Sequence, residues 1–228
     1  ETNERDGFFL ISRSLNDSWT WKHLENSSLI PVGFTPVPWS TLSFAMKTQG
    51  VKLNKVHVTH GLSANDAMKL FRRGEADYIQ MVNPFAQELI DEGSGHLAVS
   101  IGSVLGHLCY SSLAASKSLI DSKPDTVLRF VRGFYAAQRW IVEAKTNAIA
   151  DTIAPFFPGI GPDTLERSIQ MYKSLRTWAE KPLIGEDGFR TMRDILIDGG
   201  LVKNHHAYEK IVQPQFALES ITTYLSHC

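Results

Sequence analysis

Residues 67 to 91, AMKLFRRGEADYIQMVNPFAQELID, constrain the fold of this chain most. The first residues have the apolar spacing of a short helix, and Gly74 ends it where a left-handed backbone is best tolerated. Residues 76–82 then have the composition of a buried strand, which Asn83-Pro84 stops before a second helix begins. A helix, a buried strand and another helix in so short a span are typical of one lobe of an α/β fold.

Asn83 is the first candidate site residue, because it stands at the carboxyl end of the expected strand. Open α/β sheets bind ligands just beyond the carboxyl ends of their strands. The alternative, which the residues alone favour, is that Asn83 caps the following helix and Pro84 occupies its first position.

Strand and helix patterns alternate from Phe8 to about Gly106, which predicts a mostly parallel sheet covered by helices. The expected strands are residues 8–12, 28–32, 55–59, 76–82 and 96–100. The expected helices between them are residues 40–49, 65–72 and 85–92.

From Asp125 onward every pattern is helical. Asp125 is expected to cap a long helix, one face of which carries Val127, Phe130, Val131, Phe134, Gln138 and Ile141. Later helices are expected to begin near Pro162 and Glu186, and the segment PFFPG at 155–159 interrupts the series.

The order of these motifs resembles a known family. Phe-x-x-Gly-Glu-Ala-Asp at 71–77, a short apolar strand and Asn-Pro-Phe-Ala at 83–86 resemble the second-lobe signature of certain substrate-binding proteins of ABC importers. Those importers serve nitrate, taurine, aliphatic sulfonates and thiamine-pyrimidine precursors. GFFLISR at 7–13 resembles the family's crossover strand, WTWKHLENSSLIPVG at 19–33 its entry into lobe two, and GHLCYSS at 106–112 its return crossover.

The resemblance implies an α/β fold of the type II periplasmic-binding-protein kind, with two lobes around a hinge and a helical C-terminal part. It assigns residues 1–27 to a crossover strand and linker from lobe one, and residues 28–103 to a complete ligand-binding lobe two. Residues 104–228 would then be the return crossover and the C-terminal helices of lobe one.

Family members open lobe one with residues that precede a segment like 7–13, and this sequence does not contain them. The resemblance therefore implies that the leading strands of lobe one come from a separate polypeptide or a second copy, or that lobe one is rebuilt. Amphipathic helices without a sheet to cover leave apolar surface exposed. A homodimer that completes lobe one is one solution.

The loop GFTPVPWST between an expected strand and an expected helix is a second candidate site. Ser40 or Thr41 can cap the helix, whose free N–H groups favour a carboxylate, sulfonate or phosphate. The hydroxyls of Thr35 and Ser40 add donors, and Phe34 and Trp39 supply an aromatic wall. The alternative is a capped helix with Trp39 packed in the core, and the resemblance favours the binding site.

Tyr110 and His107 complete the set of candidate ligand contacts, and both lie in the return crossover. The resemblance places Tyr110 at the hinge, facing the cleft, with His107 close by. Taken alone, each is more often structural, a hydrogen-bonded tyrosine or a histidine at the edge of a core.

Composition argues against several classes of partner. The formal net charge of −1 gives no general attraction to nucleic acid or to an anionic membrane. No apolar run approaches the roughly 20 residues that span a bilayer. The resemblance implies a periplasmic or extracytoplasmic protein, with or without a lipid anchor, whose targeting segment lies outside this sequence.

We assign no metal and no cofactor from the sequence. His205-His206 is more consistent with a solvated loop than with a metal pair. Cys109 is expected to be a small buried hydrophobe and Cys228 a mobile chain end, so these two cysteines do not define a redox compartment.

The function that the resemblance implies is an extracytoplasmic solute-binding protein of an ABC importer, which is not an enzyme. Its lobes would close over a sulfonate or taurine, a nitrate-like anion or a thiamine-pyrimidine precursor, and deliver it to a membrane permease. Two alternatives stay open: a thiamine-pyrimidine-synthase-like enzyme and a ligand-sensing domain of the same fold. The catalytic and nucleotide-binding motifs G-x-S-x-G, G-x-x-x-x-G-K-[ST] and G-x-G-x-x-G do not occur.

Overall fold

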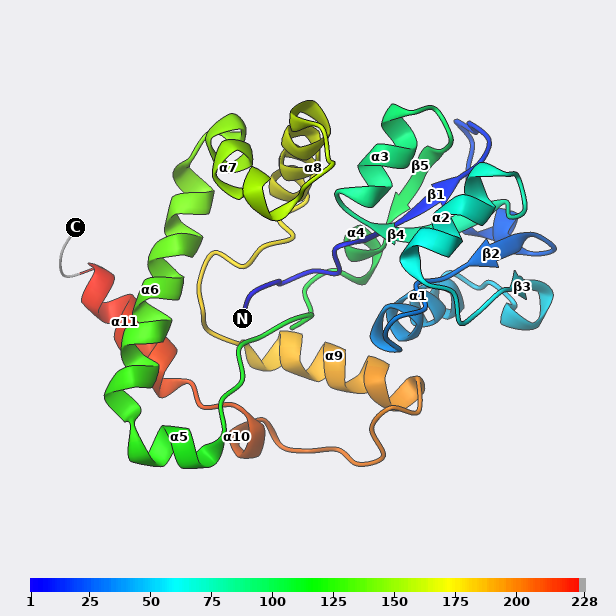
Figure 1. Cartoon of the computed structure of the whole chain (residues 1–228). Helices are drawn as coiled ribbons and strands as arrows, with labels where there is room; N and C mark the ends of the chain where they lie inside the picture. Colours follow the sequence, from blue (N-terminus) through cyan, green and yellow to red (C-terminus); the bar gives the residue numbers. More distant parts are fainter. Residues whose placement is uncertain (226–228) are drawn as a thin grey trace.

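The computed structural model describes residues 1–225 and contains one five-stranded sheet and a larger set of helices (Figure 1). The strands, in the spatial order β3-β2-β4-β1-β5, are β1 (Phe8–Ser12), β2 (Ser28–Ile30), β3 (His57–Val58), β4 (Tyr78–Val82) and β5 (His96–Ser100). All five expected strands are therefore present. β3 is reduced to two residues at the edge of the sheet, where it has a neighbour on one side only.

Four of the strands run in the same direction. β2 pairs in parallel with β3 and β4, whereas β1 pairs antiparallel with β4 and with β5. The expectation of a mostly parallel sheet is confirmed, with β1 as the reversed strand. Phe8 lies opposite Val82, so β1 begins at the edge where the other strands end.

Helices cover both faces of the sheet. α1 (Val37–Thr48) and α4 (Ile101–Leu105) lie on one face, and α2 (Ala64–Arg72) and α3 (Phe85–Asp91) lie on the other. Two short 3-10 helices, η1 (Trp21–Leu24) and η2 (Leu53–Lys55), complete this part. α2 and α3 begin within one residue of expectation, and Gly74 follows α2 with φ +89°, as its left-handed position requires.

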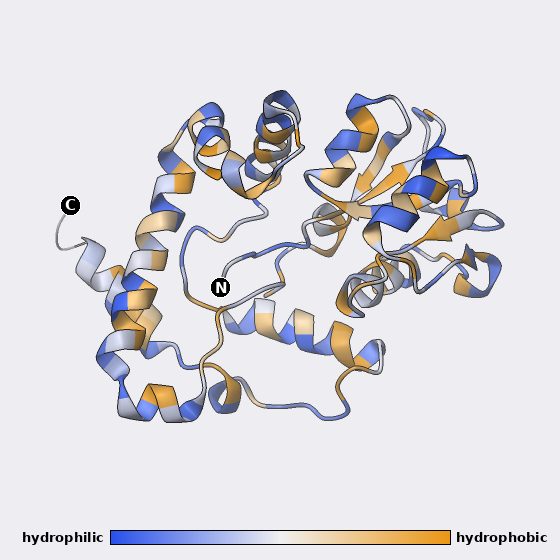
Figure 2. Ribbon diagram, in the orientation of Figure 1, coloured by the Kyte–Doolittle hydropathy of each residue, from blue (hydrophilic) through white to orange (hydrophobic). Residues whose placement is uncertain are grey.

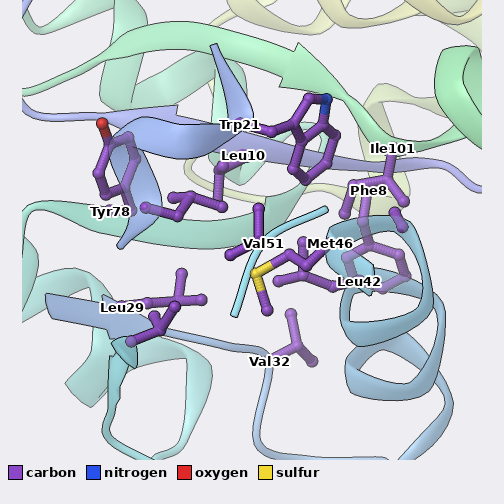
Figure 3. Close-up of a cluster of buried hydrophobic side chains, with 13 residues drawn as sticks. Phe8, Leu10, Trp21, Leu29, Val32, Leu42, Met46, Val51, Tyr78 and Ile101 are labelled. Carbon is purple, nitrogen blue, oxygen red and sulfur yellow. The ribbon is translucent and has the colours of Figure 1, made fainter. Parts of the chain in front are cut away.

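The side chains of β1 fill two core layers. Successive residues of a strand point to opposite faces. Leu10 packs with Leu42 and Met46 beneath α1 (Figure 3), whereas Ile11 packs with Phe71 of α2 on the other face. We call residues 5–105, which build this sheet and its covering helices, the sheet part.

Residues 106–225 form the helical part. Its elements are α5 (Lys117–Ser122), α6 (Pro124–Glu143), α7 (Thr146–Ile153), η3 (Ala154–Phe156), α8 (Pro162–Ser174), α9 (Glu186–Asp198), α10 (Tyr208–Ile211) and α11 (Gln215–Leu225). The helical second half is confirmed, and α8 and α9 begin at the expected residues. Asp125 lies inside the first turn of α6, so the expectation that it caps this helix is wrong, because the helix already begins at Pro124.

A ribbon of extended backbone lies between the two parts. Asn3 pairs antiparallel with Ser111 on one side and with Trp178 on the other. The amide of Thr2 donates to the carbonyl of Ser111 (2.8 Å), and the amide of Ala179 donates to the carbonyl of Thr2 (3.0 Å). The helices of the helical part form an arc around this ribbon (Figure 1).

Two expectations from the sequence concern the last residue, Cys228, and membrane-spanning segments. Cys228 lies outside the described residues. Across residues 1–225, no helix is both long and apolar enough to cross a membrane.

Candidate functional site

The edge of the sheet where the parallel strands end faces the helical part. Asn83 follows β4 and Ile101 follows β5 at this edge, and Asp6 lies there too because β1 runs the other way. Tyr172 of α8 reaches across to it. The Tyr172 hydroxyl accepts a hydrogen bond from the Asn83 amide (3.0 Å) and donates one to the carbonyl of Gly7 (3.1 Å).

Asp6 is the most constrained polar group at this edge, with 1% of its surface exposed. Its Oδ1 accepts a hydrogen bond from the amide of Phe8 (2.7 Å), whereas Oδ2 has no hydrogen-bond partner among the described residues. Burial raises the pKa of Asp6 to about 7, although the nearby Thr41 hydroxyl and the hydrogen bond from the Phe8 amide oppose the shift. The sheet edge therefore carries a buried carboxyl group with a free acceptor position.

Tyr110 lies close to Asp6. Its ring packs against that of Phe8, with 6.0 Å between the ring centres, and its hydroxyl is buried without a hydrogen-bond partner in residues 1–225. Burial raises the pKa of both Tyr110 and Tyr172, and the charge of Asp6 adds to each shift. Two tyrosine hydroxyls and one carboxyl group thus converge from three different elements.

Asn83 is held by structural contacts. Its Oδ1 accepts a hydrogen bond from the amide of Gln87 (3.1 Å), and its Nδ2 lies 3.5 Å from the carbonyl of Ser168 in α8. The Asn83 side chain thus serves the start of α3, but the expected positions are wrong, because Pro84 is the N-cap residue and the helix begins at Phe85.

The start of α1 differs from the expectation. α1 begins at Val37, so Ser40 and Thr41 lie inside its first turns and neither caps it; their hydroxyls donate to the carbonyls of Pro36 (3.2 Å) and Pro38 (3.0 Å). Prolines fit the first turn because its N–H groups have no intrahelical partner. Since proline has no N–H, this helix start offers fewer donors to an anion than the sequence suggested.

The other candidate residues of the loop differ in their exposure. Phe34 is 61% exposed, and Thr35 is half-buried. Trp39 packs against the core beneath α1 and meets the ring of His60 edge-on, with 4.8 Å between the ring centres. Of the two aromatic residues, only Trp39 is therefore held in place by packing, as in the alternative in which it belongs to the core.

Ser40 and His107 face other surroundings. Ser40 packs against Gly199, where a Cβ would lie 2.5 Å from Ser40 Oγ. His107 Nδ1 lies 3.1 Å from Asp187 Oδ2 at the start of α9. Burial lowers the pKa of His107, but the Asp187 hydrogen bond and the charges of Glu1 and Asp187 outweigh it and leave a net rise. Of the eight candidate residues, the structure brings Thr41, Asn83 and Tyr110 together around Asp6 and Tyr172.

Comparison with known proteins decides the family. The model of the NMT1-like family matches residues 28–154, more than half of the chain. The chain belongs to the NMT1-like family. The resemblance to the substrate-binding proteins of ABC importers is thereby confirmed.

Relatives of this NMT1-like chain are longer than it is. The candidate binding protein YtlA of Bacillus subtilis (strain 168) is 24% identical over 224 residues, which are 98% of this chain and 67% of YtlA.

Solved structures support the fold. The alkanesulfonate-binding protein SsuA of Xanthomonas axonopodis pv. citri, bound to MOPS, matches with a TM-score of 0.67 and 15% identity over 96% of this chain and 70% of its own. The periplasmic aliphatic sulphonate binding protein SsuA of Escherichia coli matches with a TM-score of 0.69 and 16% identity, over 92% of this chain and 67% of its own. The desulfurization enzyme DSZB matches with a TM-score of 0.67 and 14% identity, over 98% and 78%. The NMT1-like chain therefore has an α/β fold of the periplasmic-binding-protein kind, which also occurs in an enzyme.

Sequence reasoning missed three residues that organise the site of this NMT1-like chain. Asp6 and Tyr172 lie far apart in the sequence, and only the reversed direction of β1 brings them together. Gln80, fully buried in β4, accepts from the amide of Val32 (3.2 Å) and donates to the carbonyl of Pro38 (2.8 Å), so it ties the loop to the sheet. For Gln80 the sequence did contain a signal, because a glutamine stands within the apolar strand YIQMV.

Residues 1–225 contain one described cysteine, Cys109, and several histidines that could in principle bind a metal ion. In this range no three His, Cys, Asp or Glu side chains are placed to hold a metal ion. His205 and His206 lie exposed in a loop, which confirms the expectation of a solvated loop. Cys109 is partly buried, and burial raises the pKa of its thiol to about 11. Near neutral pH this thiol is protonated and therefore a poor nucleophile.

Proposed function

We propose that this chain is the ligand-binding part of an extracytoplasmic solute-binding protein that delivers a small polar molecule to the permease of an ABC importer. Membership of the NMT1-like family and the fold shared with sulfonate-binding proteins support this proposal. The segments 1–27, 28–103 and 104–228 would then be crossover, lobe two and return crossover with the later helices, and ligand would bind where they meet.

The observation that carries the proposal is the pair of unpartnered polar atoms at the sheet edge, Asp6 Oδ2 and Tyr110 Oη. A buried polar atom without a hydrogen bond costs about 1–3 kcal/mol. Such atoms are consistent with a site that a ligand completes. They also lie at the carboxyl ends of the parallel strands, where open α/β sheets bind ligands.

The chemistry of the two atoms favours one ligand class among the candidates. When ionised, the Asp6 carboxyl group accepts a hydrogen bond from an amine and repels a bare anion, and the positive charge of a bound ammonium group would itself favour the ionised form. Taurine and aminopyrimidines carry an amine, whereas nitrate and simple alkylsulfonates do not. We therefore expect an amine-bearing sulfonate or pyrimidine, with Trp39 and Phe34 at the rim of the site.

The thiol of Cys109 gives no support to an enzyme with a cysteine nucleophile. A nucleophilic cysteine requires a depressed pKa, and the pKa of Cys109 is raised.

A thermal-shift series tests the proposal. Taurine, isethionate and ethanesulfonate differ at a single position, which carries an amine, a hydroxyl or a hydrogen; nitrate and 4-aminopyrimidine complete the set. A ligand that binds only the folded state raises the Tm with its occupancy. We expect taurine or 4-aminopyrimidine to raise the Tm.

Two variants separate the site from general effects. Asp6→Asn should remove the shift, whereas Asp125→Asn, on the exposed first turn of α6, should keep it. The absence of a shift with every compound would contradict the proposed function. A shift with ethanesulfonate equal to that with taurine would leave the function standing and remove the amine requirement.

A further inference from the structure

Asp6 is the last polar residue before the chain enters β1 and the core of the sheet. Figure 2 shows the change from the hydrophilic ribbon to the hydrophobic strands. Among the described residues, no lysine, arginine or histidine forms an ion pair with the carboxyl group of Asp6. Arg5, its neighbour in the chain, has a buried Nε that is itself without a hydrogen-bond partner there. The buried carboxyl group of Asp6 therefore lacks a positively charged partner.

The polar side chains that approach Asp6 are hydroxyl groups from three elements. Thr41 lies in α1, Tyr110 in the return crossover and Tyr172 in α8. From α4, the backbone of Gly102 comes so close that a Cβ built on it would lie 2.3 Å from the carbonyl oxygen of Asp6. Burial raises the pKa of both tyrosines, so their hydroxyls stay protonated near neutral pH. None of these groups can neutralise a carboxylate.

Few of the surrounding protons are available to Asp6. The hydroxyls of Thr41 and Tyr172 each donate to a backbone carbonyl, at 3.0 and 3.1 Å. The amide of Phe8 donates to Oδ1, and the hydroxyl of Tyr110 has no partner among the described residues. A carboxylate offers about four acceptor positions, and burying one that is so poorly bonded is strongly disfavoured. The empty site therefore holds Asp6 as the neutral acid below about pH 7.

A ligand with an ammonium group changes this balance. It brings the positive charge that the site lacks, together with N–H donors for the free acceptor position. A positive charge beside a carboxyl group favours the ionised form. The O–H bond of Asp6 then breaks, the carboxylate accepts a hydrogen bond from the ammonium group, and the proton leaves to solvent. A bare anion brings no such charge and favours the neutral acid.

We propose that Asp6 exchanges its proton for the ammonium group of the ligand, so that each ligand bound releases one proton and bare anions are rejected. This inference rests on the proposed function and narrows its ligand class to molecules that are alkylammonium ions in water. With 1% of Asp6 exposed, the ligand enters when the sheet part and the helical part move apart.

The exchange makes affinity depend on pH. Below about pH 7 the proton competes with the ligand for Asp6, and above it the carboxylate is already free to bind. The Kd should therefore be about tenfold lower at pH 8 than at pH 6, and should change little at higher pH while the ligand keeps its ammonium form.

Calorimetry of the unmodified chain with taurine tests the proposal. The heat of binding is measured at pH 6 in phosphate and in Bis-Tris, and at pH 8 in phosphate and in Tris. The two buffers of each pair differ in their heat of ionisation, so the difference in binding heat counts the protons released. Buffers with a sulfonate group are avoided because they resemble the candidate ligands. We expect about one proton per taurine at pH 6 and close to none at pH 8.

Asp187→Asn is the control for another titratable group. It removes the 3.1 Å contact with His107, at the start of α9, and should leave the proton release unchanged. Loss of the release in this variant would assign the proton to His107 and overturn the proposal.

Carbon-13 NMR of the carboxyl groups tests the ligand-free protein, with Asp6 identified by the signal that Asp6→Asn lacks. At pH 5.5 the Asp6 carboxyl group should be neutral, and taurine should ionise it. Asp187 is the internal reference, because its hydrogen bond with His107 lowers its pKa and keeps it ionised.

The outcomes separate this inference from the proposed function. Taurine binding without proton release at pH 6, or an Asp6 carboxyl group already ionised at pH 5.5 without ligand, would overturn the inference alone. Binding of 4-aminopyrimidine but not of taurine would do the same. The absence of binding by every compound of the thermal-shift series would overturn the proposed function and this inference with it.

Discussion

Leu10 in the sheet part and Phe130 in the helical part are both large apolar side chains, but only Leu10 is buried. Leu10 is 0% exposed in β1, and Phe130 is 61% exposed on α6. Both belong to elements with a clear hydrophobic pattern. In the sheet part, residues close in sequence supply both the strand and the helices that cover it, whereas Phe130 on α6 stays largely exposed among the described residues. A hydrophobic pattern therefore shows which face needs a cover, but it does not show what supplies the cover.

The largest expected effect tests this contrast directly. Phe71→Ala in the sheet part should lower the free energy of unfolding by about 3–5 kcal/mol, because it leaves a cavity in a packed core. Phe130→Ala should change it by no more than about 0.5 kcal/mol, because the side chain is largely in water already. Urea unfolding of both variants measures the difference, and similar losses would break the comparison.

Asp6, at the junction of the two parts, should make stability depend on pH. Its pKa is about 7 in the folded protein against an ordinary value of 3.8. The folded state holds the proton more tightly, so this contribution is complete below about pH 4 and is lost as the pH rises through 7. The free energy of unfolding of the wild type, relative to Asp6→Asn, should fall by on the order of a few kcal/mol between pH 4 and 8. Parallel pH curves for the two proteins would contradict the assignment.

Gln80 contrasts with Asp6, because it is a buried polar residue of the sheet part that forms two hydrogen bonds. Gln80→Ala leaves the amide of Val32 and the carbonyl of Pro38 without this partner, and should cost about 1–3 kcal/mol. Gln49→Ala, on the exposed end of α1, is the control and should have little effect. Chemical denaturation of both variants tests this, and equal stabilities would show that Gln80 does not hold the loop.

The smallest effect is expected where the two parts meet in solvent. Arg167 of α8 forms a two-pronged ion pair with Asp91 of α3, at 3.0 and 2.8 Å. Exposed ion pairs contribute little, so Arg167→Ala should lower the Tm by no more than about 2 °C, and high salt should erase the difference. Arg132→Ala, which breaks an exposed pair inside the helical part, is the control. A larger loss for Arg167 that persists in salt would indicate a stronger junction than these contacts suggest.

The sequence predicted the local elements well and the site only in part. The starts of α8 and α9 follow from Pro162 and Glu186, and Gly74 ends α2 through its backbone freedom. The start of α1 was placed too late, because two prolines were read as part of a loop when they lie at the N-cap and in the first turn. That error moved Ser40 and Thr41 from capping positions into the body of the helix.

The site needed information that no local pattern contains. Asp6 faces the strand ends only because β1 is reversed, and Tyr172 reaches Asn83 and Gly7 from α8. Strand direction depends on pairing between distant segments, which residue spacing does not record.

The sequence by itself determined the alternation of strands and helices, the helical second half and the motifs that resemble the NMT1-like family, because local propensities and the spacing of apolar residues act within a few turns of chain. The tertiary structure alone decided which polar groups are buried together and which apolar face stays open. Burial depends on what packs from elsewhere. Asp6 has its raised pKa, and Phe130 its exposed ring, for that reason.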